Sequence, residues 1–202
     1  MHDEMDILRE VGSISAGQGS IALSQMLGKK IDLKLPSLEI LPGGIILNKM
    51  ILDQIVISVS CDILTGIKGN ILFLMDEKSA FKLIDICYNK EGEEKKSGWQ
   101  TEMGLSLIKE VGNVVMSSYL GALSMMLRMI MIPSIPTMIS GPAQQIMNML
   151  FNPANKADYV LLIEAVFEEQ EHKLNGSFYL ALTPESVKLI QDGCKKILES
   201  LK

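Results

Sequence analysis

A carboxylate and an amide stand at helical spacing in the middle of the chain. The string Ser106-x3-Glu110-x2-Asn113 is followed, after twenty-two further residues, by Pro136. Positions i, i+4 and i+7 of a helix share one face, so these three side chains form a polar stripe. No nucleophile–base pair, histidine or second carboxylate accompanies them for acid–base or covalent catalysis. An amide can orient water and a carboxylate can pair with a lysine of another protein, which suits an enzyme that completes a partner's active site, as in phosphoryl transfer.

An earlier copy of this motif lies 100 residues upstream. It reads Asp6-x3-Glu10-x2-Ser13, again with twenty-two residues before Pro36. Serine is shorter than asparagine and lacks the two amide donors, so we expect this site to be weak or silent, with Glu10 still available for docking. Solvated helix surface is the other interpretation of these residues. The matched frame, and an asparagine inside a helix that it does not favour, indicate a functional site at the later copy.

The elements around the two motifs follow the same 100-residue register, which implies a duplicated structural unit. Hydrophobic periodicity predicts helices over 5–28, 76–88, 100–129 and 184–201, and strands over 36–47, 54–63, 69–75, 134–141, 157–168 and 174–182. The predicted fold class is α/β (α+β): two α-β-β-β-α repeats, related by a pseudo-two-fold axis, form one domain over 1–202. The repeats span 1–92 and 93–202, with a hydrophilic hinge at 91–98. Whether the six strands make one sheet or two stays open.

Paired surface helices are predicted to carry the motifs. In the second, Leu107, Val111 and Val114 form an apolar stripe. At 100° per residue the polar stripe lies roughly a quarter turn away, so Glu110 and Asn113 should face solvent beside the core. The first helix shows the same spacing of apolar residues.

Composition excludes several classes of function. The chain has 202 residues, 48% of them hydrophobic, and a formal charge of −5 without a cluster of basic residues, which argues against nucleic-acid binding. The N-terminus lacks the layout of a secretion signal, and the Met-rich stretch 114–132 suits a buried helix better than a membrane span. The cysteines and histidines have no metal-ligand spacing, and the cysteines fit reduced thiols in a cytoplasmic protein. These residues are Cys61, Cys87, Cys194, His2 and His172.

The duplicated pattern (Asp/Ser)-x3-Glu-x2-Asn-x22-Pro resembles that of the CheC family of bacterial chemotaxis phosphatases, within the CheC/CheX/FliY superfamily. The strings at 110–114 and 117–124 are similar to the family's second site, and 22–28 resembles the segment after its first. The resemblance covers essentially the whole chain. The first copy departs from it at Ser13, where the family has asparagine. No additional flagellar-switch domain follows, which favours a stand-alone CheC.

The resemblance implies an enzyme that dephosphorylates the response regulator CheY. Glu110 would pair with the regulator's active-site lysine, and Asn113 would place a water in line with the aspartyl phosphate. Ser106 and Pro136 would frame the site. The protein would need no cofactor of its own, because the Mg²⁺ would belong to CheY. The receptor deamidase CheD is a second implied partner, and we expect a cytoplasmic monomer.

Two other functions remain open from the sequence. One is a non-catalytic adaptation scaffold that binds CheD or CheY, and the other is a structural protein related to the flagellar switch. The segment 141–148 loosely resembles a paired-glutamine deamidation site, and also fits a polar turn followed by a Met-rich helix.

Overall fold

Helices and antiparallel strands alternate along the chain. A computed structural model describes residues 2–35, 38–42, 54–88, 102–150, 159–169 and 172–200. In chain order the elements are α1 (His2–Leu27), β1 (Asp32–Lys34), β2 (Leu38–Pro42), β3 (Ile55–Ile63), β4 (Gly69–Asp76), α3 (Glu77–Tyr88), α4 (Glu102–Leu127), β5 (Thr137–Pro142), α5 (Ala143–Leu150), β6 (Tyr159–Glu169), β7 (His172–Leu182) and α6 (Pro184–Ser200). The predicted mixed α/β class is confirmed. None of the helices in these ranges has both the length and the apolar character that a membrane span requires.

The strands of the described ranges form one seven-stranded sheet. Its order is β1–β6–β7–β4–β3–β5, and β2 also pairs with β6. Every pairing among these strands is antiparallel. The central pair, β4 and β7, joins a strand from the first half of the sequence to one from the second, with Phe73 opposite Phe178. The two halves therefore share one sheet and one core.

The order of elements differs from the prediction in two places. The first predicted strand, 36–47, corresponds to β2 over its described residues, and a further short strand, β1, precedes it. Pro36, which has no N–H for a strand ladder, falls between them in the sequence. In the second half α5 lies between β5 and β6 and corresponds to the Met-rich helix that was one interpretation of 141–148. Its Ile146 and Met147 pack against the sheet face opposite α4. Pro36 itself, the hinge 91–98 and the boundary between the repeats lie outside the described residues, and the repeat stays a prediction.

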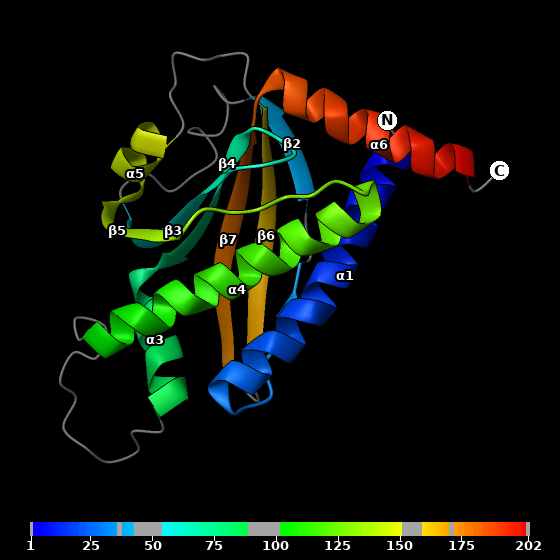
Figure 1. The fold of residues 1–202 in the computed structure, drawn as a ribbon. Coiled ribbons are helices and arrows are strands. Elements are labelled where there is room, and N and C mark those ends of the chain that lie inside the picture. The colour runs from blue at the N-terminus through cyan, green and yellow to red at the C-terminus, as the bar shows by residue number, and fades with distance from the viewer. Residues whose placement is uncertain are drawn as a thin grey trace.

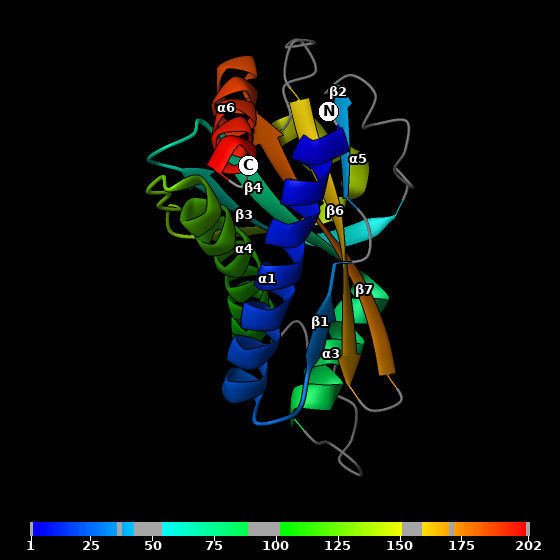
Figure 2. The same ribbon diagram turned by 90° about the vertical axis from the view of Figure 1, so that its right-hand side faces the viewer.

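The two faces of the sheet are covered unequally. Buried residues of α1, α3, α4 and α6 form one large core with one face of the strands, including Phe73 and Phe178. On the other face α5 packs over a smaller cluster that contains Val56, Leu72 and Tyr179. Figure 2 shows α5 across the sheet from α1 and α4. The motif helices α1 and α4 thus lie together on the large core.

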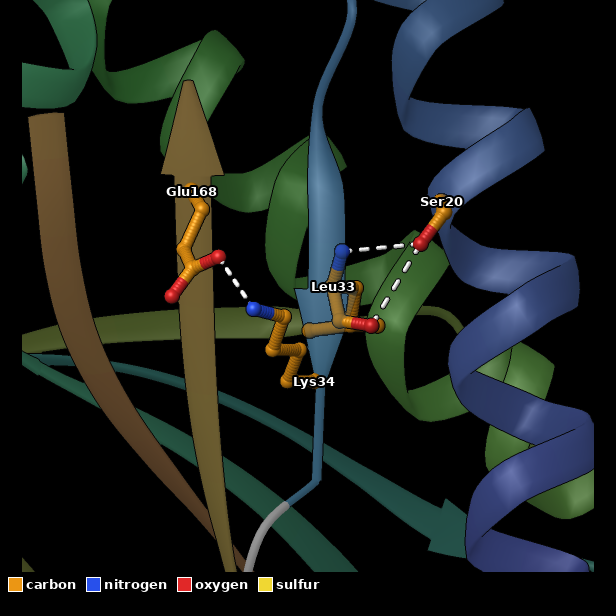
Figure 3. A network of polar contacts seen from close by, with 4 residues as sticks. All are labelled: Ser20, Leu33, Lys34 and Glu168. Atoms are coloured by element: carbon orange, nitrogen blue, oxygen red, sulfur yellow. Dashed lines mark hydrogen bonds and ion pairs between the residues drawn. The ribbon is translucent and has the colours of Figure 1, made fainter. Parts of the chain in front are cut away.

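Polar contacts hold α1 on the edge strand β1. The Ser20 hydroxyl accepts a hydrogen bond from the Leu33 N–H at 2.8 Å. On its other side β1 is tied to β6 by an ion pair between Lys34 and Glu168, and Figure 3 shows both contacts. An edge strand leaves backbone N–H and C=O groups without strand partners. Ser20 therefore both supplies a partner for a backbone group of β1 and fixes α1 along this strand.

Candidate functional site

The α4 helix contacts the sheet directly through a glycine beside the candidate amide. A Cβ at Gly112 would lie 2.8 Å from Val59 Cβ and 3.1 Å from Phe73 Cδ1. Both neighbours belong to the sheet, on β3 and β4, and both are fully buried. Only a residue without a side chain allows this approach, so the backbone at Gly112 fixes the height of Asn113 above the sheet.

The polar stripe of α4 faces away from this contact. Ser106, Glu110 and Ser117 are exposed, and Asn113 is half-buried. The Ser117 hydroxyl donates a hydrogen bond to Asn113 Oδ1 at 3.4 Å. The Glu110 carboxylate and the hydrogen-bonded Asn113 amide therefore lie on the same accessible side of α4.

The buried face of α4 is rotated from the predicted one. Val111 is fully buried, but Leu107 and Val114 are only partly buried at the margin of the core. The buried line instead includes Ile108, because Gly112 brings that side of the helix onto the sheet. At about 100° per residue Glu110 lies roughly 160° around the helix from Ile108, not a quarter turn from the core.

Pro136 lies just before β5, and β5 pairs with β3, the strand that α4 contacts. Pro136 is half-buried, and Thr137, the first residue of β5, pairs with Ser60 of β3. The hydroxyls of Ser60 and Thr137 are 2.9 Å apart. Ser60 follows Val59, the residue under Gly112, so the motif helix and the strand that follows the motif proline both contact β3. Figure 1 shows the chain running from the end of α4 back to β5.

A buried thiol lies on the same strand but is no candidate nucleophile. Burial raises the pKa of Cys61, the neighbouring Asp62 raises this pKa further, and Lys109 of α4 lowers it. A thiol that keeps its proton is a poor nucleophile and a poor metal ligand. Within the described residues no group of three or more His, Cys, Asp or Glu side chains could hold a metal ion.

The first copy of the motif lies at the other end of the helix pair. α1 and α4 run in opposite directions side by side, as Figures 1 and 2 show, and a Cβ at Gly19 would lie 3.5 Å from Ser118 Oγ. The structure therefore keeps the two motifs apart. Asp6 forms an ion pair with Arg9 at 3.0 Å, and Glu10 is exposed. Sequence reasoning missed this pair, although opposite charges at i and i+3 were a visible signal.

Sequence comparison finds a relative that matches most of the chain. It is 25% identical over 193 residues to the CheY-P phosphatase CheC of Bacillus subtilis, covering 91% of this chain and 88% of that protein. No family model matches the sequence.

Comparison with solved structures finds the same fold in two other proteins. The fold is similar to that of Thermotoga maritima FliY, with a TM-score of 0.77, 23% identity and 98% of each chain covered. It is also similar to a chain of the Borrelia burgdorferi CheX–CheY–BeF3–Mg²⁺ complex, with a TM-score of 0.50, 17% identity, and coverage of 90% and 96%. The sequence relative supports a relationship to the CheC/CheX/FliY family, and the shared fold agrees with it.

Proposed function

We propose that this chain is a phosphatase that accelerates hydrolysis of the aspartyl phosphate of a CheY response regulator. The observation that carries the proposal is the presentation of Glu110 and Asn113 on the accessible side of α4, which contacts the sheet through Gly112. The similarity to a protein named CheY-P phosphatase CheC supports the choice of substrate.

In this proposal the two side chains have different roles. Glu110, which is exposed, pairs with a lysine of the regulator. The Asn113 amide accepts a hydrogen bond from the attacking water through Oδ1 and donates one from Nδ2 to a phosphoryl oxygen. As the water oxygen bonds to phosphorus, the bond from phosphorus to the aspartate oxygen breaks. Inorganic phosphate and the free carboxylate of the regulator are released. Ser106 and Pro136 frame the site.

The metal ion in this reaction would belong to the regulator. The Borrelia complex contains Mg²⁺ and BeF3 together with CheY. A divalent ion on the regulator would neutralise charge on the phosphoryl group, so the phosphatase would need no metal ion of its own.

We propose that the first copy of the motif is inactive. Ser13 offers no amide, and the ion pair with Arg9 partly neutralises Asp6. Binding of CheD, the cytoplasmic location and the monomeric state stay predictions from the family resemblance.

The test is the decay of phosphorylated cognate CheY, followed with and without the protein. Asn113→Ala should lower the rate constant by roughly 100-fold or more, toward the intrinsic decay, as for loss of a group that stabilises a transition state. The matched control is Asn148→Ala, an exposed asparagine on α5 across the sheet, which should keep full activity. Unchanged decay with wild-type protein that nevertheless binds CheY would favour the non-catalytic scaffold.

A further inference from the structure

The Asn113 amide has one hydrogen-bond partner within its own helix. Ser117, one turn further along α4, donates its hydroxyl to Asn113 Oδ1 at 3.4 Å. An asparagine side chain can turn by 180° about its last bond and exchange its donor and acceptor ends. In the structure Oδ1 faces the Ser117 hydroxyl, and this contact restrains rotation of the amide. The two Nδ2 protons and the second lone pair of Oδ1 then stay available to a bound molecule.

The corresponding position of the first copy has no side chain. In the 100-residue register Gly17 stands where the second copy has Ser117, just as Ser13 stands in place of Asn113. Packing does not require this glycine: Gly17 is exposed, and a Cβ built on it would meet nothing within 4 Å. The first copy therefore lacks both the amide and the hydroxyl that would orient it, although α1 has room for both.

We propose that Ser117 is a positioning residue for the Asn113 amide and that Gly17 is a second defect of the first copy. The inference rests on the proposed phosphatase function. Ser117 acts through Asn113 and does not touch the regulator's phosphoryl group. Its hydroxyl restrains the amide in the orientation that accepts a hydrogen bond from the water and donates one to the phosphoryl oxygen. Without the hydroxyl, the amide rotates more freely and spends less time in the productive orientation.

The first test compares Ser117→Ala with Ser117→Thr in the full chain. The alanine variant should lower kcat for phosphorylated CheY at least threefold while KM stays within twofold, because the productive orientation is needed only in the chemical step. The threonine variant keeps a hydroxyl and should stay within twofold of wild type. An unchanged kcat in Ser117→Ala, or equal losses in both variants, would overturn the positioning role.

A second readout does not depend on catalysis. In ¹⁵N-labelled protein without CheY, the side-chain NH2 signals of Asn113, identified by their absence in Asn113→Ala, report how firmly the amide is held. Ser117→Ala should lower the order parameter of this group, and Ser117→Thr should preserve it. Equal order in wild type and Ser117→Ala would contradict the inference. A wild-type protein that does not accelerate the decay overturns the proposed function, whereas an active wild type with an unaffected Ser117→Ala overturns only the role of Ser117.

The first copy provides a gain-of-function test. In an Asn113→Ala background, Ser13→Asn alone supplies an amide that is not held, and Ser13→Asn with Gly17→Ser supplies both groups. The double replacement should be at least threefold more active than Ser13→Asn. Because any side chain at Gly17 also favours the helix, the matched control is Ser13→Asn with Gly17→Ala, which should be no more active than Ser13→Asn. Equal activity with serine and alanine at this position would refute the second defect.

Discussion

Gly112 and Gly12 occupy the same position in the two copies of the motif, yet alanine should affect them in opposite directions. At Gly112 a Cβ would lie 2.8 Å from Val59 Cβ and 2.9 Å from Val59 Cγ2. At Gly12 the nearest atom would be Leu35 Cδ1, at 4.0 Å, which is an ordinary contact. Only the second copy therefore uses its glycine to bring the helix onto the sheet.

The expected magnitudes follow from two opposing effects. Replacing glycine by alanine inside a helix stabilises by about 1 kcal/mol, because alanine loses less backbone entropy on folding. Gly12→Ala should show this gain nearly in full. At Gly112 overpacking opposes it by about 1–3 kcal/mol, since Val59 Cβ lies next to the backbone and cannot rotate away. We expect a net loss of about 1 kcal/mol for Gly112→Ala, and so a difference of about 2 kcal/mol between the variants.

Urea unfolding followed by circular dichroism measures this difference. With a slope of about 2 kcal/mol per molar urea, the two midpoints should be separated by about 1 M, with wild type between them. Gly112→Ala should also lower phosphatase activity, because α4 must move away from the sheet and carries Asn113 with it. If Gly112→Ala were as stable as Gly12→Ala, the close contact between α4 and β3 would be wrong.

Three further predictions concern the elements that support the site. Ser20→Ala should destabilise the protein by about 1–2 kcal/mol in urea unfolding, because the Leu33 N–H loses its acceptor; an unchanged midpoint would contradict this. Arg128, with φ at 52°, ends α4 at the position where Gly28, with φ at 65°, ends α1. Arg128→Gly should therefore raise the free energy of unfolding by about 0.5–1 kcal/mol, and a decrease would refute backbone strain at Arg128. Burial raises the folded-state pKa of Cys61. The stability that this pKa shift contributes is therefore complete below the unfolded pKa of about 8.5, and it is lost as the pH rises through the raised folded pKa. Urea midpoints of wild type should therefore fall more steeply between pH 7 and 10 than those of Cys61→Ala, and parallel profiles would contradict the shift.

Most helices and strands could be predicted from local hydrophobic periodicity in the sequence. The helices 5–28 and 100–129 correspond to α1 and α4, and five of the six predicted strands lie within a few residues of observed ones. The reason is that helical and strand periodicities are properties of neighbouring residues and are visible without knowledge of the fold. The face of α4 that carries Glu110 and Asn113 followed from spacing alone, and the proposed chemistry came from residue types together with the family resemblance.

Tertiary structure decided what depends on residues far apart in the chain. No local pattern specifies that β4 pairs with β7, which merges the two halves into one sheet, or that α5 covers the opposite face. The rotation of α4 was mispredicted because Gly112 has no side chain to count as apolar, and its contact with Val59 appears only after folding. The antiparallel packing of α1 and α4 likewise separates the two motifs. A side-chain period defines the faces of an element, but which surface covers each face is set by long-range packing.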